Sequence, residues 1–231
     1  MFEKLERVAI AEFDLIADGP VLVQSGKSNK INPTLPDSSF LRGLYNGEET
    51  FVIPGSTIKG VIRSYVSDTL DPTKELGDNE ISQINKLFGY IGKGNQKSKI
   101  SFHDAYALPE TVVTNIRYNT EINKLTQTAK RGTLNDLEVV EQGVFKAGFR
   151  LVNFDNKLKD LKCILNALEN INTGLVGFGG RKSRGFGKMK IGEFSLKIFE
   201  GYNADLSVKS EQEFTSFESA VKYVKGCEKC G

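Results

Sequence analysis

The sequence contains no tryptophan, a single histidine (His103) and only three cysteines among its 231 residues. A site that takes two histidines from one chain is therefore excluded, and so is a histidine-rich zinc site. The cysteines, Cys163, Cys227 and Cys230, are odd in number and too few for a disulfide framework. Cys227 and Cys230 form a C-x-x-C pair, which is half of a zinc site and has no second pair. We expect it to bind no metal, or to bind one weakly.

Long apolar runs are also missing, since none approaches the ~18 residues that a membrane helix needs. The N-terminal segment mixes charges into its apolar residues, so it does not match a signal peptide, and we expect a cytoplasmic protein with no membrane partner. Lys and Arg number 31 and Asp and Glu number 29, which gives a net charge of +2. Bulk charge therefore does not require a nucleic-acid partner, and such a role must come from local basic patches.

Apolar spacing predicts strands and helices that alternate along the chain. Strands are expected within residues 7–23, 99–108 and 138–154, and from the end of a glycine-rich loop to about residue 199. Helices are expected from Ser56 to Val66, over 78–88 and 157–170, and within 211–225, where Phe214, Phe217, Val221 and Val224 recur at helical spacing. This order predicts an α+β fold with an RRM-like (ferredoxin-like) core and insertions.

Two polar segments interrupt the predicted core. Residues 24–50 form a long loop, and residues 114–136 form an insertion or a long hairpin with scattered basic residues. Loops of this length inside a compact domain are often functional. We expect one domain over residues 1–200, followed by a C-terminal helical tail over residues 201–231 that ends in the C-x-x-C pair.

A glycine-rich segment precedes the last predicted strand. It interleaves glycines with cations, namely Gly177, Gly179, Gly180, Gly185 and Gly187 with Arg181, Lys182 and Arg184. Glycines let a backbone approach a ligand and turn its N–H groups toward an anion, and the cations suit phosphate. The segment follows a helix, unlike a dinucleotide fingerprint, and it does not have the spacing of a nucleotide phosphate loop. A tight glycine turn with a solvated basic rim is the alternative.

The helix that begins near Ser56 carries Lys59 and Arg63 four residues apart, so the two cations project side by side. Ser56 is the predicted N-cap. The positive end of a helix attracts anions, and these two cations would extend that field away from the apolar face. An ordinary capped surface helix is the alternative.

Asp37 is the most interesting carboxylate of the polar loop, since it stands just before the basic helix. An aspartate beside a phosphate-binding surface can position a metal-bound water or a ribose 2′-hydroxyl. A turn or cap aspartate is the alternative. His103 lies next to Asp104 on a predicted strand, where neighbours point to opposite faces. A lone histidine is more often structural than catalytic.

Several motifs occur in a fixed order. They are I-P-G-S-T-I-K-G-V-I-R (53–63), L-F-G (87–89), F-H-D-A (102–105), L-E-V-V-E-Q-G-V-F (137–145) and G-F-G-G-R-K-S-R-G-F-G-K (177–188). Together they resemble the RAMP superfamily of CRISPR-associated proteins. Within it the sequence looks most like the Cas7 group, in particular the Csm3-like backbone subunit of type III effector complexes. The resemblance covers about residues 7–199 and leaves the C-terminal tail unexplained.

The resemblance implies an RRM-like core, stacking of copies along a CRISPR RNA (crRNA), and a β-hairpin thumb that pushes between guide bases. It also implies cleavage of complementary target RNA by a loop aspartate, which Asp37 matches, with Mg²⁺ or another divalent cation. The metal ligands stay unassigned. The positions that match the family's RNA contacts are Ser56, Lys59 and Arg63 in the helix, Gly179, Gly180, Arg181, Lys182, Ser183 and Arg184 in the loop, and Arg117, Lys124, Lys130 and Arg131 in the thumb.

The implied function is that of a crRNA-binding backbone subunit and crRNA-guided endoribonuclease within a multisubunit complex. Its partners would be the crRNA, target RNA, further copies of itself and other type III Cas subunits. A non-catalytic capping or scaffold subunit similar to Csm4 or Csm5 is one alternative. A Cas6-like enzyme that processes precursor crRNA, usually with a histidine or tyrosine base, is another, although the helix motif at 53–63 argues against it. A general RNA-binding module is the third.

Overall fold

The computed structural model describes residues 4–24, 26, 36–69, 83–91, 95–155, 157–202 and 207–226. One sheet has the strand order β10-β9-β1-β8-β5-β3-β2, and β4 pairs with β8 along the same edge as β5. Its strands are β1 (Arg7–Ala17), β2 (Arg42–Tyr45), β3 (Glu48–Ile53), β4 (Ile100–Phe102), β5 (Ala105–Ala107), β8 (Val144–Val152), β9 (Met189–Tyr202) and β10 (Val208–Phe214). All the pairings among these strands are antiparallel in the described residues.

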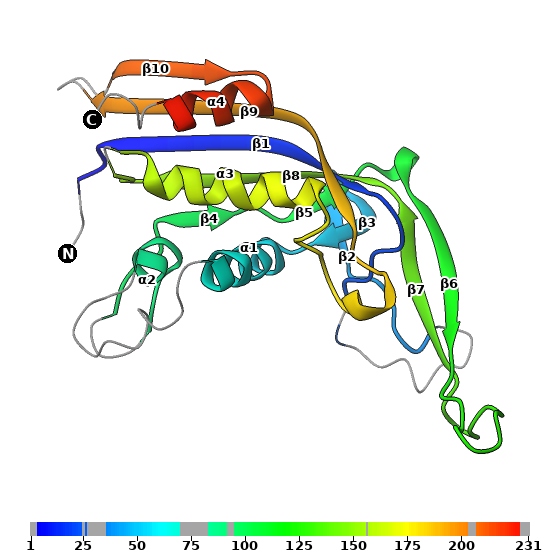
Figure 1. Cartoon of the computed structure of the whole chain (residues 1–231). Coiled ribbons are helices and arrows are strands. Elements are labelled where there is room, and N and C mark those ends of the chain that lie inside the picture. The colour runs from blue at the N-terminus through cyan, green and yellow to red at the C-terminus, as the bar shows by residue number, and fades with distance from the viewer. Residues whose placement is uncertain are drawn as a thin grey trace.

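The centre of the sheet has the topology of a ferredoxin-like fold. Helix α1 (Gly55–Thr69) follows β1 through the β2–β3 hairpin, and α3 (Lys159–Asn172) follows β8. The spatial order is β9, β1, β8 and then the β4–β5 segment. Figure 1 shows α1 and α3 on the same side of the sheet. The predicted α+β fold is therefore confirmed.

The core forms because two apolar periodicities meet. Alternate residues of β1 from Ala9 to Ala17 are buried, among them Phe13 and Leu15, whereas Glu12 on the opposite face is exposed. In α3 the buried residues recur every three or four positions, as an amphipathic helix requires. The predicted helix over 157–170 is confirmed, with bounds shifted by two residues.

The start of α1 differs from the prediction. Ile58, Ile62 and Val66 are buried as expected, but Ser56 is exposed in the first turn and is not the cap. Instead the Asp104 Oδ1 atom accepts a hydrogen bond from the Gly55 N–H at 2.7 Å. The helix end can lie this close to the sheet because Gly55 has no side chain: a Cβ at this position would come within 2.3 Å of the Phe102 carbonyl oxygen in β4.

Two other predicted elements were wrong in their extent. The expected strand over 99–108 is divided into β4 and β5, since His103 and Asp104 leave the strand between them. The expected helix over 211–225 is β10 followed by α4 (Phe217–Gly226), and Phe214 is the last residue of the strand. Of the helix expected over 78–88, α2 covers Gln83–Phe88, and residues 78–82 lie outside the described residues.

A separate two-stranded sheet extends away from the main one (Figure 1). It pairs β6 (Val113–Asn119) with β7 (Asn135–Gln142), after the 3-10 helix η2 (Pro109–Thr111). Nearly all of β6 is exposed, whereas β7 buries Leu137, Val139 and Val140. The chain then passes through Gly143 into β8, so the two strands predicted around that glycine belong to different sheets.

Candidate nucleic-acid interface

The glycine-rich loop is held against the segment that follows β1. The Gly180 N–H donates to the Leu22 carbonyl at 2.9 Å, and the Gly187 N–H donates to the Pro20 carbonyl at 2.8 Å. Gly179 has a φ of +71°, and a Cβ there would lie 2.1 Å from the Leu22 oxygen. Glycine is therefore required at position 179 by both conformation and space.

The tip of this loop presents cations to solvent. It forms the 3-10 helix η3 (Lys182–Arg184), in which Lys182, Ser183 and Arg184 are exposed, and Arg181 before it is half-buried. Across the described ranges, no carboxylate forms an ion pair with any of these three basic side chains. Their charge is thus available to an external anion such as a phosphate.

A small apolar cluster joins this loop to the β6–β7 hairpin. Leu22, Leu137 and Val139 are fully buried, and Phe186 packs against them. Leu137 and Val139 belong to β7, and Phe186 belongs to the glycine-rich loop. Figure 1 shows the loop, in gold, between α1 and the hairpin.

Asp37 lies against the same part of β7. Ser38 forms a parallel bridge with Leu137. The Asp37 N–H donates to Asp136 Oδ1 at 2.8 Å, and the Asp136 N–H donates to Asp37 Oδ2 at 3.3 Å. The fold thus brings Asp37, strand β7 and the glycine-rich loop together around Leu137.

Two carboxylates of β7 that the sequence analysis missed fasten the Asp37 loop. The hydrogen bond from the Asp37 amide holds the pKa of Asp136 below its ordinary value, so this carboxylate stays ionised as an acceptor. Glu138 accepts from the Phe40 N–H at 3.1 Å and pairs with Arg42 at 2.5 Å. No local pattern marks these contacts, because they join residues 96 to 99 positions apart.

The cations of α1 contact another part of the chain. Lys59 Nζ donates to Ser98 Oγ at 2.8 Å, and Arg63 reaches Asn85 Oδ1 at 3.3 Å and the Gly89 carbonyl at 3.5 Å. Burial, and then the nearby Arg63 charge, lower the pKa of Lys59. Both side chains are half-buried, so they tie α1 to α2 and to the segment before β4.

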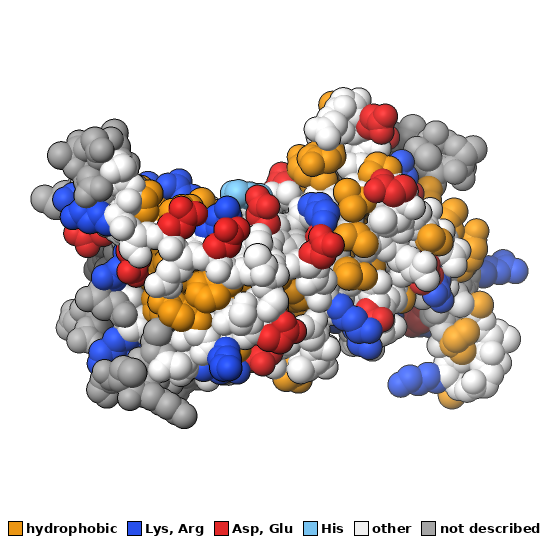
Figure 2. Space-filling view, turned by 90° about the horizontal axis from the view of Figure 1, so that it is seen from above, with side chains coloured by type: hydrophobic (Ala, Val, Ile, Leu, Met, Phe, Trp, Pro, Cys, Tyr) orange, Lys and Arg blue, Asp and Glu red, His pale blue; other side chains and the backbone are white. Residues whose placement is uncertain are grey.

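The predicted thumb cations divide into two kinds. Arg117 Nη2 pairs with Glu141 Oε1 at 2.6 Å, and Lys130 pairs with Glu121. Lys124 and Arg131 are exposed and have no ion pair within the described segments. Figure 2 shows both signs of charge interspersed over one face of the molecule, so local unpaired cations carry the positive character.

A family model of the RAMP superfamily matches residues 17–190. The chain belongs to the RAMP superfamily. Proteins of this superfamily are CRISPR-associated, and they generally bind crRNA and act in multisubunit complexes. No curated protein matches the chain. The matched residues of this RAMP protein include Asp37, α1, the hairpin and the glycine-rich loop, whereas β10 and α4 lie beyond them.

Asp37 is the carboxylate of this RAMP protein that would suit a magnesium ion. Mg²⁺ prefers oxygen ligands and is often held by one or two carboxylates together with waters and substrate phosphates. Asp37 Oδ2 accepts from the Asp136 N–H, which leaves Asp37 Oδ1 for an external ligand. Among the residues that the structure describes, no group of three or more His, Cys, Asp or Glu side chains forms a candidate metal site.

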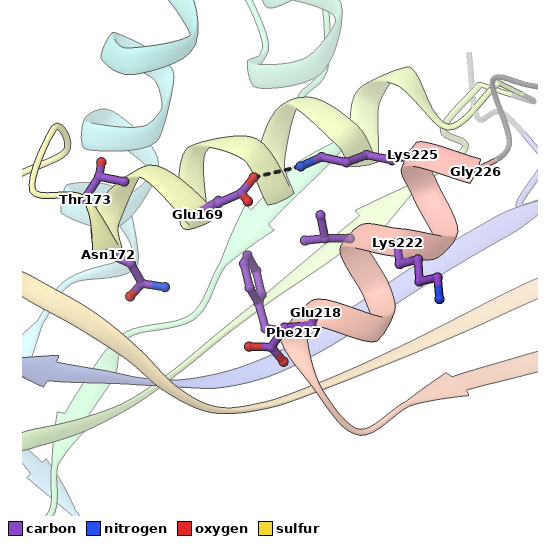
Figure 3. A pocket seen from close by; sticks show the side chains of 9 residues that line it. Glu169, Asn172, Thr173, Phe217, Glu218, Lys222, Lys225 and Gly226 are labelled. Atoms are coloured by element: carbon purple, nitrogen blue, oxygen red, sulfur yellow. Dashed lines mark hydrogen bonds and ion pairs between the residues drawn. The ribbon is translucent and has the colours of Figure 1, made fainter.

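A pocket of this RAMP protein lies away from these residues. It has a volume of about 730 Å³ and lies between α3 and α4, next to the ion pair of Lys225 with Glu169 (Figure 3). Phe217 and Val221 form part of its lining, and none of the predicted site residues does. The helices within the described ranges are each too short or too polar to span a membrane.

Proposed function

We propose that this RAMP protein is a Csm3-like backbone subunit of the Cas7 group in a type III effector complex. In this function it binds a crRNA, stacks with further copies of itself and other Cas subunits, and cleaves complementary target RNA through Asp37. The motif order supports the subfamily. The mixed surface charge is consistent with a protein that stacks on itself.

One observation supports this proposal most strongly. The Asp37 loop and the glycine-rich loop both contact β7 at Leu137, although these segments are far apart in the sequence. A carboxylate, three unpaired cations and a projecting hairpin therefore belong to one contact region. The proposed cleavage uses this combination, since phosphates are held and a nucleotide is displaced beside the reacting group.

RNA binding in this proposal is independent of sequence on the protein side. Arg181, Lys182 and Arg184 contact phosphates, and Lys124 and Arg131 near the hairpin tip add further charge. Base pairing between guide and target supplies the sequence choice. Lys59 and Arg63 then support the surface by holding α1 and α2 together, in addition to any phosphate that they reach.

Asp37 acts on the target ribose in this proposal. Its carboxylate orients the 2′-hydroxyl and accepts its proton, while the 2′-oxygen forms a bond to the adjacent phosphorus. The bond from phosphorus to the 5′-oxygen breaks, and that oxygen leaves with a proton from water. The products are a 2′,3′-cyclic phosphate and a 5′-hydroxyl end. A divalent cation such as Mg²⁺ would, when bound, stabilise charge on the phosphate oxygens.

The first test is to purify the protein from its native context and to sequence the RNA bound to it. Repeat-plus-spacer RNA protected along most of its length supports a backbone subunit, whereas a repeat-derived end alone supports a cap or a processing enzyme. The second test is Asp37→Ala in the assembled complex, with Glu48→Ala, an exposed carboxylate at the start of β3, as the control. Loss of target cleavage with retained target binding in Asp37→Ala alone supports the proposal. Full cleavage by that variant would falsify the role of Asp37.

A non-catalytic scaffold subunit is the second candidate. The reciprocal hydrogen bonds between Asp37 and Asp136 are also those that a purely structural aspartate would make. In a scaffold subunit, Asp37→Ala would lower the melting temperature of the complex, and the wild-type complex would not cleave at intervals set by this subunit.

A further inference from the structure

The Asp37 loop is attached to the thumb strand β7 along several residues. The Ser38 N–H donates to the Asp136 carbonyl at 3.2 Å, and the Glu138 N–H donates to the Ser38 carbonyl at 2.9 Å. Two side chains of β7 reinforce these backbone bonds, since Asp136 accepts from Asp37 and Glu138 accepts from Phe40. The Asp37 loop therefore runs parallel to β7 at Ser38 and is fixed to that strand.

The contacts at Asp136 act on the carboxylate of Asp37 itself. The Asp136 carboxylate fixes the Asp37 backbone through its N–H, and the Asp136 N–H holds Asp37 Oδ2. Among the described residues, Asp37 Oδ1 accepts no hydrogen bond. One carboxylate oxygen is thus anchored to the thumb, and the other is left to act on an external group.

We infer that Asp136 is the positioning residue for Asp37, so that the thumb strand β7 sets the place and the orientation of the catalytic carboxylate. This inference rests on the proposed function, because it requires Asp37 to act on the target RNA. Asp136 opposes Tyr118 in the hairpin register, and the Tyr118 side chain is 67% exposed. A displacement of the hairpin at this register position is therefore transmitted to Asp37 through one residue.

A positioning role requires Asp136 only to accept a hydrogen bond from the Asp37 N–H, whereas a direct role in the reaction would require its negative charge. Asp136→Asn keeps an oxygen that can accept from the Asp37 N–H but removes the charge. Asp136→Ala removes the acceptor altogether. Asn135→Ala is the matched control, because Asn135 is the neighbouring residue of β7 and its side chain donates to Thr133 rather than to Asp37.

The experiment measures single-turnover cleavage of a complementary RNA by the assembled complex, together with target affinity and thermal melting. For Asp136→Ala we expect a cleavage rate about 10- to 100-fold lower, as for a misplaced reacting group, with target affinity within about twofold of wild type. For Asp136→Asn and Asn135→Ala we expect rates within about threefold of wild type.

Two outcomes overturn the inference. An Asp136→Ala rate equal to that of wild type shows that Asp37 does not depend on Asp136. An Asp136→Asn variant that melts as wild type but is as slow as Asp136→Ala shows that the charge is needed, as for a metal ligand. Asp37→Ala is measured in the same assembly: if it cleaves normally, the proposed function fails as well, and if it is inactive while Asp136→Ala is active, only the inference fails.

Discussion

Gly179 lies so close to Leu22 that a Cβ at position 179 would be 2.1 Å from the Leu22 carbonyl oxygen. This close approach places the glycine-rich loop on the segment after β1. Phe186 of the loop then packs against the apolar cluster of Leu22, Leu137 and Val139. Substitution at this position therefore tests whether the loop is required for the whole contact region.

Gly179→Ala should destabilise the protein and weaken RNA binding together. The new methyl group clashes with backbone, and the φ of +71° is unfavourable for alanine, so we expect a loss of roughly 2 kcal/mol or more in unfolding free energy. Gly180→Ala is the control, because a Cβ there meets nothing within 4 Å. Urea unfolding measures both variants, and equal stabilities would contradict the packing argument.

The unpaired cations of the loop should contribute to RNA affinity in a salt-dependent way. Replacing Lys182 and Arg184 by alanine removes two candidate phosphate contacts. The plot of log association constant against log salt concentration should therefore become less steep by about 1.4 for single-stranded RNA. Arg117→Ala is the comparison, since Arg117 is already paired with Glu141. Filter binding over a salt series gives the slopes, and an unchanged slope in the double variant would remove this loop from the RNA surface.

Asp104→Ala should weaken the start of α1. Loss of the side-chain acceptor at a helix N-terminus typically costs about 1 kcal/mol, and Asp104 accepts from the Gly55 N–H at 2.7 Å. Asp104→Asn keeps an acceptor oxygen and should lose much less. Ser56→Ala should be nearly neutral, because Ser56 is exposed and is not the cap. A larger effect at Ser56 than at Asp104, measured by chemical denaturation, would reverse the assignment.

The pH dependence of stability should include a contribution from Asp18. This carboxylate pairs with Lys188 at 2.8 Å and Lys190 at 3.1 Å, and hydrogen bonds from these two lysines lower its pKa. A folded pKa below the unfolded value of about 3.9 means that the contribution is present above that pH. It is lost as the pH falls through the folded pKa. Asp18→Asn should therefore show a shallower decline in melting temperature below about pH 4. A decline identical to that of wild type would show that the pair does not contribute.

The parts of the structure that the sequence predicts are those with local causes. The apolar spacing in α1 and α3 identifies their buried faces directly, because each side of a helix is made by residues three or four apart. Phe214 is wrongly predicted as helical for the same reason. Its spacing from Phe217 is that of a helix, although Phe214 is the last residue of β10. Ser216 marks the boundary between β10 and α4, because its hydroxyl accepts from the Ser219 N–H at 3.2 Å in the first turn of the helix.

The parts that the sequence does not predict depend on contacts between distant segments. Asp104 caps a helix that begins 49 residues earlier, and Asp136 holds Asp37 across 99 residues. Such pairs have no periodicity or spacing, and only the sheet topology brings them together. Arg117 is a similar case. The sequence alone predicts a cation free to bind phosphate, but in the folded hairpin Arg117 forms an ion pair with Glu141.

The hairpin has an outer strand with no neighbour of its own in the main sheet. Because β6 is almost fully exposed, and the buried side chains of the pair belong to β7, the connection to the core runs through one strand only. An isolated pair of strands is only marginally stable in water. The amide protons of β6 can therefore exchange with solvent by local fraying that leaves β1 and β8 closed. We therefore expect β6 to open more readily than the main sheet, and an RNA or protein surface that covers β6 would slow its exchange without altering the core.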